Sequence, residues 1–266
     1  MKRVTVNETN RNDYGKRCPV REKGKKNMEI TIGHLYPDLL NLYGDRGNIQ
    51  CMRKRLEWRG IEAKVKEYQL TDTIDFAELD IVLLGGGSDR EQMLVCNQLK
   101  TIQKDFKAYV EDGGTVLAVC GGYQLLGHYY DTSEGRIEGL SLVDLYTEQG
   151  SPRLISNIVI ENEQFPYPIV GFENHGGRTH IGDNRPLGRV TVGFGNNGED
   201  KEEGVLYKGV VGTYLHGPLL PKNPHVCDYL LKNALERKYG SILLEPLEDA
   251  QEREANQYIV DRFKKG

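Results

Sequence analysis

The chain has 266 residues, enough for one large domain or two small ones with a substantial hydrophobic core. Apolar residues make up 38% of it, and no run of them approaches the roughly 18 that a membrane-spanning helix needs, so the composition excludes a transmembrane protein. The first residues are basic and polar without an apolar segment, which argues against a secretory signal and favours the cytoplasm. The five cysteines are widely separated and contain no C-x-x-C pair, so neither a disulfide framework nor a metal site is predicted.

The net charge of −4 is unevenly distributed along the chain. Residues 1–27 contain nine Lys or Arg and three Asp or Glu, a net charge of +6, which leaves −10 on the rest. An acidic body argues against a nucleic-acid partner, because neutralising phosphates requires clustered basic side chains. Residues 1–27 lack hydrophobic periodicity, so we expect a disordered extension, with Met28 a candidate start. A basic arm that binds RNA or anionic lipid is the less favoured alternative.

From Met28 onward, strand-like and helix-like segments alternate. Strands are predicted over 29–33, 61–68, 80–84 and 115–119, and helices over 47–58, over 89–111 with a break, and directly after Cys120. Ser88 and Glu91 have the spacing of a capping box at the start of the second helix. This order predicts an α/β fold, a three-layer sandwich with a largely parallel central sheet, whose ligands bind beyond the carboxyl ends of the strands.

The second half of the chain is richer in short strand-like segments separated by Gly, Asn and Pro. Strands are predicted over 157–161, 169–172, 189–194 and 205–215, and helices return over 224–239 and 247–263. No internal repeat or low-complexity linker divides this part, so residues 28–266 are expected to form one domain.

The strongest chemical signal is residues 118–122, Ala-Val-Cys-Gly-Gly, at the end of a predicted buried strand. A nucleophile on a tight strand-to-helix turn needs small residues two positions before and two after it, and Ala118 and Gly122 meet this need. The following helix would direct free N–H groups at the sulfur of Cys120 and favour the thiolate. The alternative is a buried structural cysteine beside a glycine turn.

A thiolate that attacks a carbonyl needs N–H donors for the developing oxyanion. Residues 85–87, three consecutive glycines, end the neighbouring predicted strand and belong on the same edge of the sheet as Cys120. Their amides and that of Gly121 are candidate donors. A phosphate-binding loop is the competing interpretation, but the G-x-x-x-x-G-K-[ST] pattern does not occur in the chain.

A cysteine hydrolase also needs a base that later protonates the leaving group, usually His. His216 follows a strand-like run that stops abruptly at 217–218, so its ring should lie near the same edge of the sheet. His175, within 173–177, is the main rival. The remaining histidines are expected to be surface or packing residues: His34, His128, His180 and His225.

These motifs resemble the class I, or triad-type, glutamine amidotransferases. Residues 119–124 are similar to their C-x-G-x-Q signature, and residues 214–218 to the histidine segment of the cobyric acid synthase-like branch. Within that branch, three segments are similar to the GatD family, the glutaminase subunits of lipid II isoglutaminyl synthase: 85–91, 171–179 and 193–197. The resemblance extends from Met28 to about Phe263.

The resemblance implies hydrolysis of L-glutamine through a thioester on Cys120. Ammonia would pass to a Mur ligase-like synthetase subunit (MurT) in a heterodimer, which amidates the D-glutamate α-carboxylate of lipid II in peptidoglycan synthesis. Forming that amide requires an activated carboxylate, so ATP and Mg are expected on the partner, and no cofactor or metal is expected on this chain.

The same resemblance implies roles for individual residues. Cys120 and His216 would be catalytic, and Arg153 matches the Arg that binds glutamine, a natural bidentate partner for its α-carboxylate. The other substrate-binding candidates are Gly86, Gly87, Gly121 and Gln124.

One departure from the class pattern concerns the third catalytic residue. The class has Glu two residues after the histidine, whereas this chain has Pro218, so no catalytic carboxylate is assigned and a Cys-His dyad is expected. Three alternatives stay open: an amidotransferase component of cobyrinic or cobyric acid-type amidation, a stand-alone cysteine hydrolase such as a γ-glutamyl hydrolase, and a non-catalytic scaffold subunit.

Overall fold

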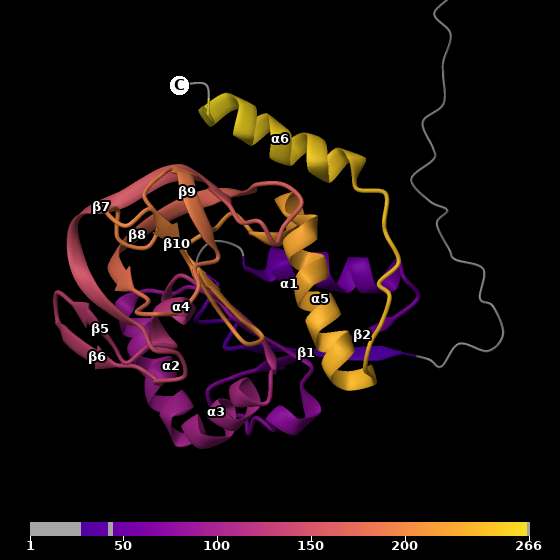
Figure 1. Cartoon of the computed structure of the whole chain (residues 1–266). Coiled ribbons are helices and arrows are strands. Elements are labelled where there is room, and N and C mark those ends of the chain that lie inside the picture. The colour runs from indigo at the N-terminus through magenta and orange to yellow at the C-terminus, as the bar shows by residue number, and fades with distance from the viewer. Residues whose placement is uncertain (1–27, 42–44, 265–266) are drawn as a thin grey trace, which may run out of the picture.

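The computed structural model describes residues 28–41 and 45–264 (Figure 1). The extension predicted over residues 1–27, including Cys18, lies outside the described residues. The four other cysteines are free thiols: Cys51, Cys96, Cys120 and Cys227.

The first of two sheets has six strands, in the order β11-β12-β4-β3-β1-β2. Its strands are β1 (Glu29–Leu35), β2 (Glu62–Tyr68), β3 (Ile81–Leu84), β4 (Thr115–Val119), β11 (Val205–Tyr207) and β12 (Val210–Thr213). All neighbouring pairs are parallel except β11 with β12. Every residue of β3, β4 and β12 is buried, as expected for apolar strands covered on both faces.

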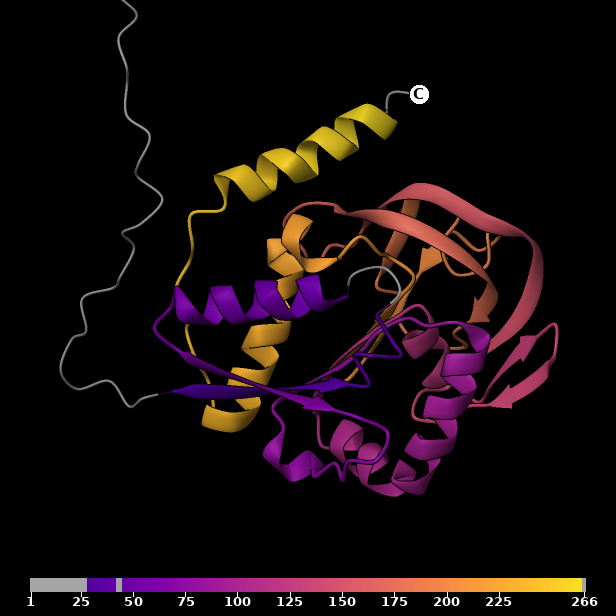
Figure 2. The same cartoon turned by 180° about the vertical axis from the view of Figure 1, so that it is seen from behind.

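Helices cover both faces of this sheet. Helices α1 (Arg46–Glu57) and α5 (Pro224–Tyr239) lie against each other on one face, and α2 (Asp89–Thr101) and α3 (Gln103–Glu111) lie on the other (Figures 1 and 2). The β1 to β2 and β3 to β4 connections run in opposite directions across the sheet, so right-handed crossovers place their helices on opposite faces. The predicted α/β sandwich with a largely parallel sheet is confirmed.

Local signals place the helix that follows β3. The Ser88 hydroxyl accepts a hydrogen bond from the Glu91 amide, and the Ser88 amide donates one to the Glu91 carboxylate at 2.8 Å, which confirms the capping box. The predicted break lies at Ile102, between α2 and α3. The short 3₁₀ helix η1 (Phe76–Glu78) packs beside α3 through the stacked rings of Phe76 and Phe106.

Residues 129–203 contribute the strands of a separate, mostly antiparallel sheet, in the order β10-β9-β7-β5-β6 with β8 paired to β7. Its strands are β5 (Tyr129–Thr132), β6 (Gly135–Glu138), β7 (Tyr146–Glu161), β8 (Ile169–His180), β9 (Gly188–Val192) and β10 (Glu202–Glu203). The predicted strand-rich character is confirmed, but the strands predicted over 157–161 and 169–172 are only parts of the much longer β7 and β8.

One predicted strand is wrong. The segment 205–215 is a hairpin of β11 and β12, which turns at Lys208 and Gly209. Lys208 has φ of 50°, and a Cβ on Gly209 would lie 2.5 Å from the Gly114 oxygen. Apolar residues on both sides of this turn hide it from an analysis of hydrophobic periodicity.

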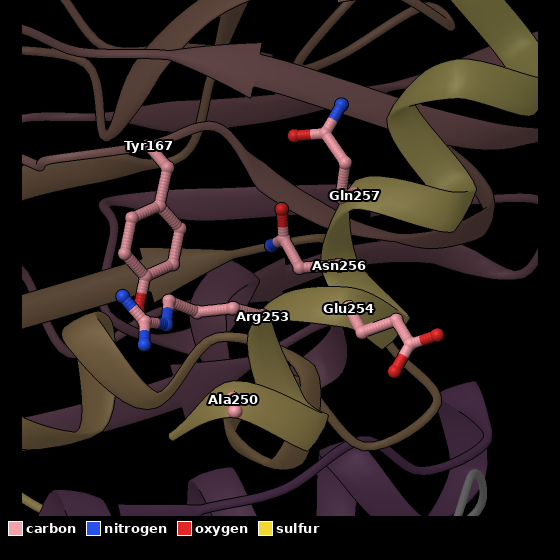
Figure 3. A pocket seen from close by; sticks show the side chains of 6 residues that line it. All are labelled: Tyr167, Ala250, Arg253, Glu254, Asn256 and Gln257. Carbon is pink, nitrogen blue, oxygen red and sulfur yellow. The ribbon is translucent and has the colours of Figure 1, made fainter. Parts of the chain in front are cut away.

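The C-terminal helix α6 (Ala250–Lys264) packs across the second sheet, where Val260 joins Val159 and Val170 in a small apolar cluster. The Asn256 amide lies 3.0 Å from the Lys222 oxygen, at the end of the 3₁₀ helix η2 (Leu220–Lys222). Tyr167 and side chains of α6 line a cavity of about 460 Å³. Figure 3 shows these side chains. Over residues 28–41 and 45–264, no helix is long and apolar enough to cross a membrane.

Candidate active site

Cys120 occupies a sharp turn between β4 and the short helix α4 (Gly121–Leu125). Its backbone angles, φ of 52° and ψ of −109°, lie in a region that residues other than Gly rarely adopt. Such backbone strain is typical of functional positions. A Cβ on Gly122 would lie 2.5 Å from the Leu84 oxygen. The predicted strand-to-helix turn is therefore present. The backbone of β3 lies so close to position 122 that only Gly fits there.

The three glycines that follow β3 lie against this turn. A Cβ on Gly86 would lie 3.1 Å from the Cys120 Cβ and 3.7 Å from its Sγ, which places the Gly86 backbone beside the thiol. The Gly86 amide, however, donates to Oδ2 of Asp45 at 3.0 Å. One expected oxyanion donor is thus bound to a buried carboxyl group. Asp45 is not among the predicted site residues. It directly precedes α1, where Asp is a common helix cap, but its side chain makes no capping hydrogen bond.

Burial and, to a smaller extent, the charge of the nearby Asp45 raise the pKa of the Cys120 thiol to about 12, against the opposing effects of the Gly121 amide and Arg153. The amide at the N-terminus of α4 favours the thiolate, as expected, but the net shift of the thiol pKa is upward, opposite to the predicted direction. Helix α4 has only five residues, and its contribution is smaller than the loss of hydration of the buried sulfur. Proton removal must therefore accompany attack on the substrate.

Changing Asp45 to Asn is expected to lower the pKa of Cys120. Burial raises the pKa of Asp45 itself to about 6, so above that pH it is anionic and disfavours a second negative charge on the sulfur. Asn keeps an acceptor for the Gly86 amide but removes the charge. We expect the pH profile of Cys120 alkylation by iodoacetamide, followed by mass spectrometry, to move about one unit lower.

Asp38→Asn is the matched control, because Asp38 is an exposed carboxylate on the same connection between β1 and α1. Its alkylation profile should coincide with that of the unmodified chain. An Asp45→Asn profile that stays in place or moves to higher pH contradicts the electrostatic role of Asp45.

His216 lies three residues beyond the end of β12, and its amide donates to the Phe172 oxygen at 2.8 Å, which ties it to the second sheet. Its ring is buried. Burial, followed by the charges of His175 and Arg153, lowers the pKa of His216 to about 3. At neutral pH the imidazole is therefore neutral, the form that can accept the thiol proton.

His175, the rival base, is also buried and lines the same cavity as Cys120. Its Nδ1 lies 2.9 Å from the Gly177 oxygen, and its Nε2 lies 3.6 Å from the Glu173 carboxylate. Its ring stacks on Tyr214 with 3.6 Å between centroids. The Nδ1 contact and the stacking hold the His175 ring in place, but its Nε2 has no hydrogen-bond partner among the described residues. His216 stays the predicted base and His175 its rival.

The cavity in front of Cys120 has a volume of about 260 Å³, suited to a small molecule. Of the predicted binding residues, Gly87, Gln124 and Arg153 line it, whereas Gly86 and Gly121 are not among its lining residues. Sequence reasoning missed several others: Ser88, Asp89, Gln92, Tyr130, Asn174 and Gly176.

Arg153 comes from β7, at a register shift between Gln149 and Leu154. Its Nε donates to the side-chain Oδ1 of Asn174 at 3.0 Å, and its Nη2 donates to the backbone carbonyl oxygen of Asn174 at 2.9 Å. Asn174, on the adjacent β8, therefore fixes the plane of the guanidinium. A positive, oriented fork opposite a buried thiol can hold a small substrate by its carboxylate.

Comparison with known proteins agrees with this arrangement. The model of the CobB/CobQ-like glutamine amidotransferase domain matches residues 31–224. The subunit GatD of lipid II isoglutaminyl synthase (glutamine-hydrolyzing) from Staphylococcus aureus (strain N315) is 51% identical over 237 residues, which cover 88% of this chain and 96% of that protein. The same subunit from Streptococcus pneumoniae (strain ATCC BAA-255 / R6) is 42% identical over 242 residues, 90% and 93% of the two chains.

Among solved structures, a chain of PurLQS from Thermotoga maritima superposes with a TM-score of 0.51 at 20% identity, covering 79% of this chain and 99% of that one, which supports the fold alone. The match to the domain model and the two long alignments with GatD subunits agree with the elbow and its cavity. The chain therefore belongs to the CobB/CobQ-like glutamine amidotransferases and, within them, to the GatD family of glutamine-hydrolysing subunits.

Proposed function

We propose that this chain is the glutaminase subunit of a lipid II isoglutaminyl synthase. It hydrolyses L-glutamine to glutamate and ammonia, and the ammonia amidates the D-glutamate α-carboxylate of lipid II to D-isoglutamine. The observation that carries the proposal is the pairing of Cys120, on its strained turn, with Arg153 on the wall of the same small cavity. The identities of 51% and 42% to GatD subunits support the pathway.

The reaction starts from a protonated thiol. His216 accepts the Cys120 proton as the sulfur bonds to the γ-carboxamide carbon, and backbone amides bind the oxyanion. The imidazolium then protonates the departing nitrogen, the C–N bond breaks, and ammonia leaves a glutamyl thioester on Cys120. Water attacks this thioester after giving a proton to His216, the C–S bond breaks, and that proton returns to the sulfur as glutamate departs.

The cavity walls orient the substrate. Arg153 binds the α-carboxylate through the donors that Asn174 leaves unused. Gln124 lines the cavity, and its amide nitrogen donates to the Tyr214 hydroxyl at 3.1 Å, which holds it in place. Gly121 and Gly87 are the candidate oxyanion donors, and Gly86 joins them only after its amide leaves Asp45.

The synthetase chemistry belongs to another chain in this proposal. Converting a free carboxylate to an amide requires activation, and the domain model that matches this chain is that of an amidotransferase. We assign ATP and Mg to a Mur ligase-like subunit (MurT), bound as a heterodimer in the cytoplasm, with lipid II reached only through that partner. The GatD relatives are themselves named as subunits, which supports a complex.

The test is reconstitution. The full chain, co-purified with a Mur ligase-like protein, should amidate a soluble lipid II analogue with glutamine and ATP, as detected by mass spectrometry. A corrinoid acid and a γ-glutamyl peptide are the comparison substrates, and the first is chosen because cobyric acid synthases also match part of this chain. Amidation of the corrinoid alone, or cleavage of the peptide without transfer, overturns the proposal.

A further inference from the structure

Glu203 is a fully buried carboxyl group at the junction of the two sheets. It ends the short strand β10 of the second sheet, and after Gly204 the chain continues as β11 of the first sheet. Its neighbour Glu202 is only half-buried. A carboxyl group without exposure needs strong hydrogen-bond donors to offset its lost hydration, so its partners indicate what the site is built to hold.

Two donors to Glu203 come from the segment that leads to His216, beside a backbone hydrogen bond from its neighbour Gly204. Oε1 of Glu203 accepts from the Thr213 hydroxyl at 2.7 Å and from the Tyr214 amide at 2.7 Å. Thr213 is the last residue of β12 that pairs with β4, so these contacts lie where the sheet stops supporting the chain.

Beyond Thr213, each successive amide is bound outside the parallel sheet. The Tyr214 amide donates to Glu203, and the Leu215 amide donates to the Thr213 hydroxyl oxygen at 3.0 Å. The His216 amide donates to Phe172 on β8. Because the single hydroxyl proton of Thr213 is directed at Glu203, its lone pairs face Leu215. Glu203 thereby determines, directly or through Thr213, the path of the two residues before His216.

Thr213 also holds the nucleophile. Its backbone oxygen accepts from the Cys120 amide at 2.8 Å, so the residue fixed by Glu203 touches the turn that carries the thiol. We propose that Glu203 is a positioning residue of the glutaminase site, which sets the imidazole of His216 relative to Cys120 by anchoring Thr213 and Tyr214. This role rests on the proposed glutaminase function. Glu203 itself does not line the substrate cavity.

The chemistry of the group suggests a conservative replacement. Burial and, to a smaller extent, Glu173 raise the pKa of Glu203 to about 8 against the lowering effect of its hydrogen bonds, so the protonated form is favoured at neutral pH. A protonated carboxyl accepts hydrogen bonds through its carbonyl oxygen, as the side-chain amide of Gln does. Gln should therefore preserve the anchor, whereas Leu fills similar space without an acceptor.

The experiment compares Glu203→Leu, Glu203→Gln and the control Glu202→Leu in the full chain, alone and with its co-expressed synthetase. Ammonia release from glutamine is followed to separate kcat from KM. We expect kcat of Glu203→Leu to fall about 100-fold, because a small misplacement of the base slows proton transfer strongly. KM should stay within about threefold, because Arg153, which binds the substrate, is unchanged. Glu203→Gln and Glu202→Leu should stay within about threefold of the unmodified kcat.

A second pair of variants protects the test against misfolding. If Glu203→Leu does not fold, Thr213→Val takes its place, because it removes the hydroxyl that links Glu203 to Leu215. Its kcat should fall, whereas Thr213→Ser, which keeps the hydroxyl, should retain the kcat of the unmodified chain. Hydrogen exchange at Leu215 and His216 is a readout that needs no activity, and it should quicken in Glu203→Leu or Thr213→Val but not in the conservative variants.

Unchanged kcat and exchange in Glu203→Leu and Thr213→Val overturn the positioning role, as does a rise in KM alone or an equal loss of kcat in Glu203→Gln. If the unmodified chain releases no ammonia from glutamine under any condition, the proposed function fails instead, and the exchange measurement still decides whether Glu203 anchors this segment.

Discussion

Cys120→Ser is expected to reduce ammonia release from glutamine about 1,000-fold or more, because a hydroxyl is a much weaker nucleophile than a thiol on the same strained turn. The backbone of the turn is retained, so the complex with the synthetase should still amidate its acceptor when free ammonium replaces glutamine. His216→Ala should likewise lose the glutamine-dependent activity and keep the ammonium-dependent one. Without a base, the buried thiol, whose pKa is about 12, stays protonated. Steady-state assays with the two nitrogen sources measure both effects.

Cys51→Ser is the matched control, because Cys51 is a free, half-buried thiol on α1 that does not line the catalytic cavity. It should keep the activity of the unmodified chain with either nitrogen source. Full glutaminase activity in Cys120→Ser contradicts the mechanism. If His175→Ala abolishes activity while His216→Ala retains it, the base is His175.

Arg153→Met is expected to raise KM for glutamine about 100-fold with a much smaller change in kcat, because a charge-assisted contact to the α-carboxylate contributes about 1.5–3 kcal/mol. Arg153→Lys should give an intermediate KM, since Lys keeps the positive charge but loses the planar fork that Asn174 orients. Initial rates over a range of glutamine concentrations provide the measurement.

A second substrate makes this test specific. Glutaminamide lacks the α-carboxylate, so the unmodified chain and Arg153→Met should hydrolyse it with similar kcat/KM. Arg136→Met is the protein control, because Arg136 pairs with Asp131 on the β5–β6 hairpin and does not line the cavity. A loss in Arg153→Met that is equal for both substrates shows that Arg153 does not bind the carboxylate.

Several parts of the site follow from short stretches of sequence. The elbow could be predicted because the steric need for Ala118 and Gly122 is local, and the capping box of Ser88 and Glu91 fixes the start of α2 in the same way. The buried strands β3 and β4 are continuous apolar runs, whose carboxyl ends lie at one edge of a parallel sheet. This places the glycines that follow β3 beside Cys120 without knowledge of the rest of the chain.

The electrostatics of the site depend on residues that are distant in sequence. Asp45 lies 41 positions before Gly86, with which it forms a hydrogen bond, and Asn174 lies 21 positions after Arg153. Neither pair has a local pattern, because side-chain contacts between elements depend on how those elements pack. The prediction of a favoured thiolate failed for the same reason: the number of donors at a helix terminus can be read locally, but the loss of hydration around the sulfur cannot.

Short stretches of sequence predict the candidate nucleophile Cys120, the glycine backbone beside it and the α/β class, because strand, turn and helix preferences act over a few residues. The contrast between the basic residues 1–27 and the acidic remainder of the chain also follows from the sequence alone, although residues 1–27 lie outside the structure described. Only the tertiary structure revealed the second sheet, which brings Arg153, Asn174 and Phe172 to the first, and the Glu203 contact that holds the segment before His216. These features arise from pairing between strands far apart in the chain, where burial and hydrogen-bond geometry exist only after the two sheets have packed together.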